Sequence, residues 1–205
     1  MSEAEPAALP AVPGRACGTC SLCCKVMEIG ALDKGAGQWC SHVVKGKGCA
    51  IYSDRPAECR RFGCGWLHWP KAGEHWFPAR SKMVIVAQDR TRLAVHVDPA
   101  TPNAWKARPF YDDLKLWARN PQVFGFRQVL VVNGRHMIAV LPDREVDLGH
   151  VSEDEIVLSG QTTGGGWTAL KVSADDPQLE TIRQGGNYEI GGAAKQPDHG
   201  GAAEA

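Results

Sequence analysis

The sequence predicts an α+β protein in which a small cysteine-rich, metal-bound module packs on a mainly antiparallel β unit. All eight cysteines lie between Cys17 and Cys64 of a chain of 205 residues. After residue 81 the chain contains short apolar runs and alternating segments separated by turn signals, which is typical of strands. One stretch in that part has helical spacing. A chain of this length can hold one sizeable core, or a small module attached to one ordinary domain.

The composition divides the chain into four parts. Residues 1–14 are rich in Ala, Pro and Glu and are expected to form a disordered leader. Residues 15–80 hold every cysteine but few Leu, Ile or Val, so we expect a cysteine-cluster metal-binding module that draws folding free energy from the metal. Residues 81–172 are expected to form a small α+β unit. Residues 173–205 are expected to form a short helix and a flexible Gly/Ala-rich tail.

Two antiparallel strand pairs are expected within the α+β unit. The apolar run Met83–Ala87 and the alternating segment Arg92–Val97 form the first pair. The second pair consists of residues 127–132 and 136–141, which flank Asn133-Gly134. Both turn residues tolerate positive φ, as a type I′ hairpin turn requires.

A helix and a further strand complete the predicted elements of this unit. Residues 109–119 have apolar side chains at helical intervals, and Asn120-Pro121 ends the helix. Trp167–Val172 is predicted to be a strand. The Asp176-Pro177 pair fits the start of another helix, which Gly185-Gly186 would end.

Charge and hydropathy exclude some classes of partner. The 23 basic and 23 acidic side chains cancel, so no overall field favours nucleic acid or an anionic membrane. No run approaches the roughly 20 apolar residues that span a bilayer. The first residues lack the positive and apolar regions of a secretory signal, so we expect a cytoplasmic protein. A protein partner remains possible.

The cysteine spacing favours metal ligands over disulfides, because disulfides are rare in a reducing cytosol. The run Cys17-x2-Cys20-x2-Cys23 resembles the first three ligands of a bacterial ferredoxin run, although the Cys-Pro ending is missing. Adjacent side chains diverge, so Cys23 and Cys24 fit two centres, or one polynuclear centre, better than one mononuclear site. The expected ligands are Cys17, Cys20, Cys23, Cys24, Cys40, Cys49, Cys59 and Cys64, with Cys64 the least firmly placed.

Eight thiols also match two four-cysteine zinc sites, since structural zinc is nearly always four-coordinate. Residues 15–70 contain eight Lys or Arg and four Asp or Glu. Eight thiolates would turn this excess of four positive charges into an excess of four negative charges. Two divalent zinc ions, or two clusters with a +2 core, would bring the balance to zero. Charge therefore supports a cationic metal without naming it.

The cysteine run and the stretch that follows it resemble the CxxCxxCC cysteine-cluster family. The resemblance rests on Cys-x2-Cys-x2-Cys-Cys and on the sequence from Cys49 to Phe62, Cys-Ala-Ile-Tyr-Ser-Asp-Arg-Pro-Ala-Glu-Cys-Arg-Arg-Phe. It covers residues 15–70. These bacterial proteins, also called YkgJ-like, are described as zinc- or iron-chelating, and a related motif occurs in flagellin lysine methylases. The resemblance implies metal binding and transfers no substrate site to residues 81–205.

Several other residues near the cysteines have two interpretations. Arg60 and Arg61 could favour the Cys59 thiolate and donate hydrogen bonds to cluster sulfurs, or could be solvated surface charges. His42, His68 and His75 could replace a sulfur ligand, but ordinary histidines are favoured where eight thiols are available. The tryptophans of Trp66-Leu67-His68-Trp69 more simply supply the apolar core that the module lacks.

We therefore expect a metal-binding protein that holds an iron–sulfur cluster or iron, with a role in electron transfer, redox sensing or iron handling. The ferredoxin-like spacing and the adjacent pair favour iron–sulfur. Structural zinc with an interaction role for the β unit is the first alternative. A cluster-dependent enzyme, as the methylase relative suggests, is the second. No catalytic signature is found in the sequence.

Overall fold

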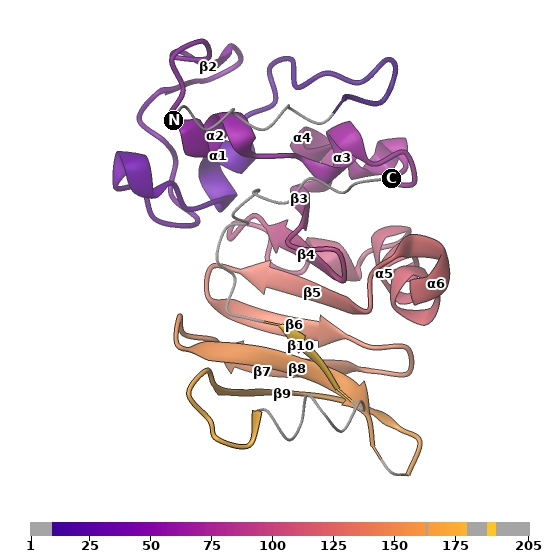
Figure 1. The fold of residues 1–205 in the computed structure, drawn as a ribbon. Coiled ribbons are helices and arrows are strands. Elements are labelled where there is room, and N and C mark those ends of the chain that lie inside the picture. The colour runs from indigo at the N-terminus through magenta and orange to yellow at the C-terminus, as the bar shows by residue number, and fades with distance from the viewer. Residues whose placement is uncertain (1–9, 163, 180–187, 192–205) are drawn as a thin grey trace, which may run out of the picture.

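The chain folds around a five-stranded sheet with a smaller three-stranded sheet below it (Figure 1). The structure is a computed structural model, and it describes residues 10–162, 164–179 and 188–191. The larger sheet has the order β3-β4-β5-β6-β7 and the smaller one the order β10-β8-β9. Their strands are β3 (Met83–Ala87), β4 (Arg92–Val97), β5 (Gln128–Asn133), β6 (His136–Val140), β7 (Glu145–His150), β8 (Glu155–Gln161), β9 (Trp167–Ser173) and β10 (Tyr188–Gly191).

Short helices and one short hairpin precede the large sheet in the chain. The hairpin joins β1 (Val43–Val44) and β2 (Gly48–Cys49). The helices are α1 (Cys23–Val26), α2 (Ala57–Arg61), α3 (Gly65–His68), α4 (Pro78–Ser81), α5 (Phe110–Arg119) and α6 (Pro121–Phe124), and the 3-10 helices are η1 (Gly30–Leu32), η2 (Glu74–Trp76) and η3 (Ala104–Lys106). The predicted α+β class is confirmed.

Strand pairing is antiparallel except between β4 and β5, where Leu93 lies opposite Val129 in a parallel pair. The segment with η3, α5 and α6 returns the chain to the end of the sheet at which β4 began. Such a return is what a parallel pair requires, because two parallel strands cannot be joined by a tight turn. The predicted hairpins around residues 88–91 and 133–136 are confirmed.

Three strands of the two larger sheets were not expected from the sequence. In β7, Leu148 is the one buried residue, so its sequence lacks a clear apolar alternation. In β8 the buried run includes Ser159 and Gly160, which obscured it. The strand β10 pairs with β8 inside the segment expected to be a flexible tail. The helix expected after Asp176 falls largely on residues outside the described part of the chain.

The end of the expected leader is ordered against the module. Val12 donates its backbone N–H to the carbonyl of Leu67 at 2.8 Å. The carbonyl of Pro10 lies 3.1 Å from Nδ1 of His68. These backbone contacts do not depend on large apolar side chains, which is why composition alone assigned residues 10–14 to the leader.

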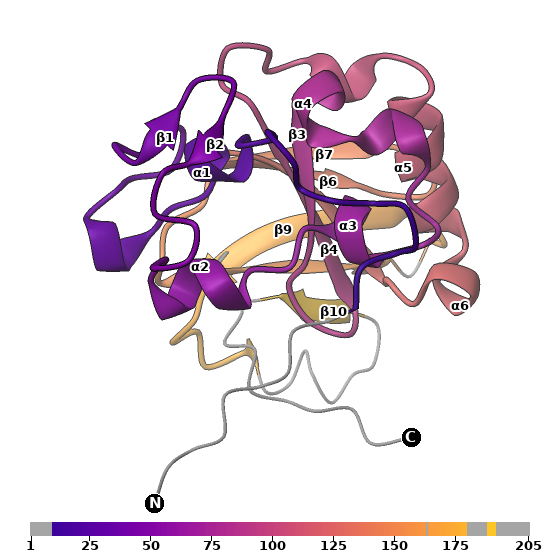
Figure 2. The same cartoon turned by 90° about the horizontal axis from the view of Figure 1, so that it is seen from above.

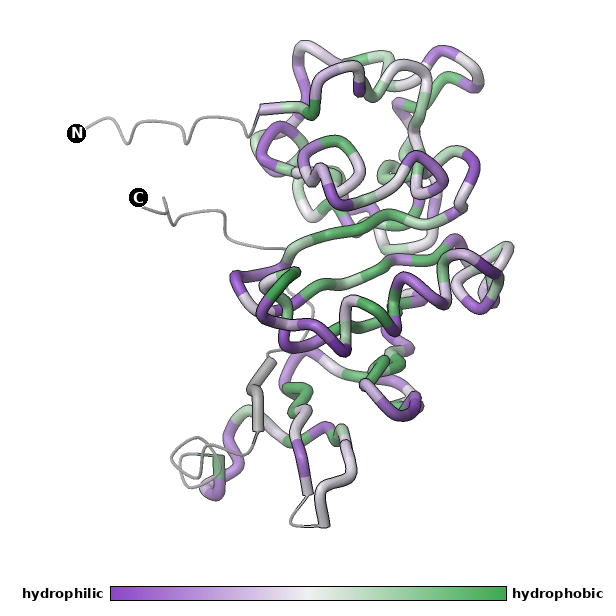
Figure 3. Tube along the Cα trace, turned by 90° about the vertical axis from the view of Figure 1, so that its right-hand side faces the viewer, coloured by the Kyte–Doolittle hydropathy of each residue, from purple (hydrophilic) through white to green (hydrophobic). Residues whose placement is uncertain are grey.

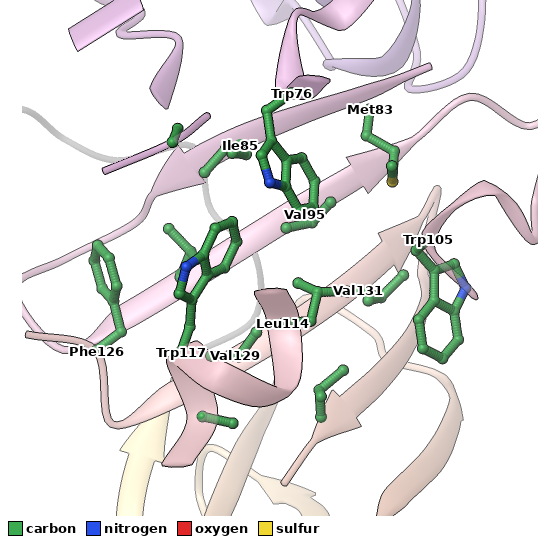
Figure 4. Packing of buried hydrophobic residues seen from close by; sticks show 14 of the residues in the cluster. Trp76, Met83, Ile85, Val95, Trp105, Leu114, Trp117, Phe126, Val129 and Val131 are labelled. Atoms are coloured by element: carbon green, nitrogen blue, oxygen red, sulfur yellow. The ribbon is translucent and has the colours of Figure 1, made fainter. Parts of the chain in front are cut away.

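The main core lies on one face of the large sheet (Figure 4). It combines Trp66 and Trp76 from the cysteine-rich segment with Trp117 of α5 and strand residues such as Ile85 and Val95. Trp76 stacks near Trp117, with ring centroids 5.0 Å apart. Of the two tryptophans expected to be core residues, Trp66 belongs to this cluster and Trp69 packs against it, so that expectation is confirmed, and the core runs across residue 80 without interruption.

Two groups of residues pack against the opposite face of the large sheet. Leu130, Val132 and Ala139 pack against Val157 and Ala169 of the smaller sheet. Apolar segments accordingly concentrate in the strands (Figure 3). At the β3 edge, Val84 and Val86 pack instead against the residues of α1 and its flanks, Leu22, Val26 and Met27. Because both faces of β3 are covered, Met83–Ala87 is an apolar run rather than an alternating one.

No helix in the described part of the chain is long and apolar enough to cross a bilayer.

Candidate metal centre

The elements that carry the cysteines gather on one side of the molecule. Seen from above, α1, α2 and the β1–β2 hairpin lie together, away from α4 and α5 (Figure 2). Cys23 and Cys24 begin α1, Cys49 ends β2, and Cys59 lies in α2. Cys64 directly precedes α3, which packs against β3. All eight cysteines are free thiols, and Cys40 is the most buried.

These thiols border a single cavity of about 100 Å³. Its remaining lining is mostly apolar, and it includes Met27, Ile29, Phe62 and Leu67. A cavity lined by thiols and apolar groups would keep water away from an ion bound there, and it suits soft, thiophilic metals better than oxygen-seeking ones. The lining cysteines are Cys17, Cys20, Cys23, Cys24, Cys40, Cys49, Cys59 and Cys64, which is the whole set expected from the sequence.

The backbone turns of the first cysteine run explain how it reaches the cavity. Cys20 donates its N–H to the carbonyl of Cys17 at 2.9 Å, and Gly18 supplies positive φ within that turn. Cys24 then donates to the carbonyl of Ser21 at 3.0 Å as the chain enters α1. Two residues between cysteines are therefore enough to bring both side chains to the cavity.

The later cysteines are tied to this run by backbone contacts. Cys40 donates its N–H to the carbonyl of Cys24 at 3.0 Å. Cys49 pairs with Val43 across the β1–β2 hairpin, whose turn contains Gly46 and Gly48 at positive φ. The hairpin thus brings Cys49 to the cavity from a different part of the chain, a long-range placement that spacing alone does not define.

One part of the set lies against the sheet. Cys20, Cys23 and Cys64 pack on the apolar cluster formed by α1 and by Val84 and Val86. Burial raises the pKa of Cys64 to about 11. Cys64, the ligand expected with the least support from the sequence, thus lines the cavity and also packs against the sheet.

The adjacent pair Cys23 and Cys24 is electrostatically coupled. A hydrogen bond between the two sulfurs, together with burial, raises the pKa of Cys23 well above its usual range. The same hydrogen bond, aided by Lys34 and Arg55, lowers the pKa of Cys24 to about 7. Cys23 is thus the hydrogen-bond donor of the pair, and Cys24 is the thiol that more readily forms the thiolate.

Burial raises the pKa of Cys17 and of Cys59 as well, and neighbouring thiols add to the effect. The nearby positive charge of Arg55 acts in the opposite direction on both. Thiols whose negative charges disfavour one another in this way gain most from a cation that neutralises them together.

Two cations therefore flank the thiols, and sequence reasoning did not single out either as a charge partner. Arg55 lines the cavity and lies 3.7 Å from the ring centroid of Tyr52. Lys34 is 6% exposed and acts electrostatically on Cys23, Cys24, Cys40 and Cys59. Arg55 belongs to the motif from Cys49 to Phe62, which gave a weak signal for its role. No sequence pattern marked Lys34.

Arg60 and Arg61, the arginines expected to act on Cys59, do not line the cavity as Arg55 does. Arg60 donates from its guanidinium to the carbonyl of Arg55 at 2.8 Å, so it supports the loop that holds Arg55. Arg61 is exposed. The positive charge that acts on Cys59 includes Arg55, which is four residues earlier in the chain.

Of the three histidines near the cysteines, His42 lines the cavity. His75 lies 2.7 Å from the carboxylate of Asp113, which also accepts from the indole of Trp76 at 2.8 Å. His68 contacts the carbonyl of Pro10. His68 and His75 thus have structural partners, as the simpler interpretation expected.

Within residues 10–162, 164–179 and 188–191, no three Cys, His, Asp or Glu side chains converge closely enough to hold one ion as they stand. The donor set nevertheless fits a thiolate-bound metal: eight thiols share one cavity, and cations flank them. A cysteine side chain has a single torsion, so a change of rotamer moves its sulfur within the cavity that it lines.

The fold and cavity together define the class: an α+β protein with a multi-thiol cavity beside the first strand of its sheet. No protein-family model, curated protein or solved structure matches the chain.

Proposed function

We propose that this protein binds metal through its clustered cysteines and holds iron, as an iron–sulfur cluster or as bound iron, for electron transfer, redox sensing or iron handling. The observation that carries the proposal is the presence of all eight thiols, from Cys17 to Cys64, in the lining of one cavity. Membership of the CxxCxxCC cysteine-cluster family is part of the same proposal and rests on the motif residues.

The surroundings of the thiols support this function. A metal–thiolate centre is anionic, and Lys34 and Arg55 supply positive charge beside it. Apolar lining residues such as Phe62 and Leu67 would restrict water and thereby protect a cluster from hydrolysis and oxidation. Adjacent Cys23 and Cys24 fit two centres or one polynuclear centre, which favours a cluster over a single ion.

The test is metal content together with an absorbance spectrum, on protein expressed with iron and purified without oxygen. Stoichiometric iron and sulfide with broad visible absorption are expected. Stoichiometric zinc in a colourless protein would replace the redox role by the structural zinc alternative. A folded protein with eight reactive thiols and neither metal would overturn metal binding altogether.

Single substitutions connect the metal to this cavity. Cys24→Ser and Cys59→Ser are expected to lower the bound metal substantially, because each removes a thiol from a different wall of the cavity. Ser41→Ala is the matched control, since Ser41 is exposed and adjoins Cys40. Equal metal content in all three variants would show that the metal lies elsewhere.

A further inference from the structure

Lys34 is a buried lysine whose position the cysteine pattern does not explain. Its ammonium donates to the carbonyl of Lys25 at 2.9 Å and also to the carbonyl of Met27. These carbonyls belong to the last turn of α1 and the residue that follows it, and α1 begins with Cys23 and Cys24. Lys34 therefore fixes the far end of the helix that presents the adjacent thiols.

The backbone around Lys34 is held from two sides. Ile29 and Lys34 exchange backbone hydrogen bonds of 2.8 and 3.1 Å, which closes the loop that contains η1. The carboxylate of Glu58, in α2, accepts from the N–H groups of Gly30 and Ala31 at 3.3 and 3.2 Å. This loop consequently joins α1 to α2, the two helices that carry Cys24 and Cys59.

Beyond these backbone contacts, the Lys34 ammonium interacts electrostatically with thiols from three parts of the chain. Burial lowers the pKa of Lys34, and Cys24, Cys40, Cys23 and Cys59 act in the opposite direction. Burying an ammonium is costly unless anionic or strongly polar groups compensate it. Neutral thiols compensate poorly, whereas thiolates bound to a metal compensate well.

We propose that Lys34 is a positioning residue that balances the negative charge of the thiolates of Cys23, Cys24, Cys40 and Cys59 when they bind metal. The inference rests on the proposed metal-binding function. A divalent ion held by four thiolates has a formal charge of −2. Lys34 and Arg55 together supply the balancing charge: Lys34 is buried in the fold, and Arg55 lines the cavity.

Two variants separate the charge of Lys34 from its hydrogen bonds. Lys34→Gln and Lys34→Arg both keep donors for the two carbonyls, but only the arginine keeps the charge. In competition titrations with Zn²⁺ as the probe, Lys34→Gln is expected to lose about tenfold or more in affinity, and Lys34→Arg to remain near the wild type. Lys45→Gln, at an exposed position between β1 and β2, is the control and should not change the affinity.

A second readout does not require metal. In the reduced, metal-free protein at pH 7, the reaction of the thiols with a disulfide reagent is expected to slow several-fold in Lys34→Gln and to recover in Lys34→Arg, because the thiolate is the reacting form. If the wild type binds neither zinc nor iron but this slowing is seen, the metal-binding function fails and the pairing of Lys34 with the thiolates is supported. If Gln and Arg variants behave alike in both assays, the role of Lys34 is overturned.

A measurement on the wild type covers the case in which Lys34→Gln does not fold. Acetylation of the Lys34 amine by acetic anhydride, followed by mass spectrometry, is expected to slow several-fold on zinc binding, because an anionic centre favours the unreactive ammonium. The exposed Lys45 serves as the internal reference. An unchanged ratio of the two rates would overturn the proposal.

Discussion

At the residue scale, Arg15 shows how one side chain can organise the turns of an irregular segment. Its guanidinium donates to the carbonyls of Trp66 at 2.6 Å, Trp69 at 3.2 Å and Ala72 at 2.7 Å. It also pairs with Glu74 at 2.8 Å, and its side chain is 9% exposed. These carbonyls lie in and after α3, where no helix continues to satisfy them.

Replacing Arg15 by Ala should therefore destabilise the protein by about 2–3 kcal/mol, since three partly buried carbonyls lose a charged donor. Urea unfolding measures the change. Arg61→Ala, which truncates an exposed arginine of the same segment, is the control and should change the free energy of unfolding by about 0.5 kcal/mol or less. Equal effects of the two substitutions would contradict the role of Arg15.

His96, in β4, makes the stability of the folded protein depend on pH. Burial lowers its pKa to about 4, and it lies between Val84 and Val132 in the sheet. Its Nε2 is buried without a hydrogen-bond partner in the described residues. The unfolded chain, with an ordinary pKa of about 6.5, binds a proton at a higher pH than the folded chain does. The part of the stability that depends on neutral His96 is therefore fully present above pH 6.5, and it is lost as the pH drops toward 4.

The wild type should lose up to about 3 kcal/mol of stability through His96 over this range. His96→Leu should remove this part of the pH dependence, because the side chain can no longer bind a proton. Urea unfolding of both proteins at pH 7, 5.5 and 4.5 gives the difference. Parallel pH profiles would show that His96 does not cause the loss.

At the element scale, the approach of α3 to β3 positions Cys64. Gly65 begins α3, and a Cβ added there would lie 2.7 Å from Cγ2 and 2.9 Å from the carbonyl oxygen of Ile85. A side chain at this position would therefore push α3 from the sheet. The tight contact depends on glycine because backbone, rather than a flexible side-chain end, is one of the atoms in the way.

Gly65→Ala is expected to destabilise the protein by about 2 kcal/mol and to weaken metal binding by displacing Cys64. Thermal unfolding and metal titration measure the two effects. Gly30→Ala provides a matched comparison, since a Cβ there meets nothing within 4 Å. A Gly65→Ala protein as stable as the Gly30→Ala protein would contradict this account of the helix–strand contact.

Individual elements differed in how well sequence predicted them. Arg92–Val97 was found with the predicted bounds because Leu93, Val95 and Val97 recur on one face, which packs in the main core. Residues 145–150 were missed because a strand near the smaller sheet buries little of its own surface. The pairing partners of β8 depend on Tyr188–Gly191, nearly thirty residues further along, and local patterns contain no such information.

At the scale of the whole molecule, the two sides of the protein differ in the size of their apolar cores. The core around Trp76, Trp117 and Leu114 is large and fully buried. The cysteine side rests on a smaller apolar cluster that includes Leu22 and Val26. Small segments with little core usually depend on bound metal for stability.

Metal removal should therefore loosen residues 17–64 while leaving β3–β6 protected. Hydrogen–deuterium exchange with mass spectrometry, with and without a chelator, measures this difference. Peptides from α1, α2 and the β1–β2 hairpin should exchange much faster after metal removal, and peptides from β4 and β5 should change little. A uniform change along the chain would instead show that metal stabilises the molecule as one unit.

The sequence by itself determined the local features of this protein: the α+β class, the strands around Asn133-Gly134, and the set of cysteines from Cys17 to Cys64. These follow from short-range spacing, which sets the backbone and the direction of nearby side chains. The tertiary structure decided which walls the thiols share, and it brought Lys34 and Arg55 to them. That arrangement depends on burying both faces of β3 beneath distant segments, a long-range contact that spacing along the chain does not encode.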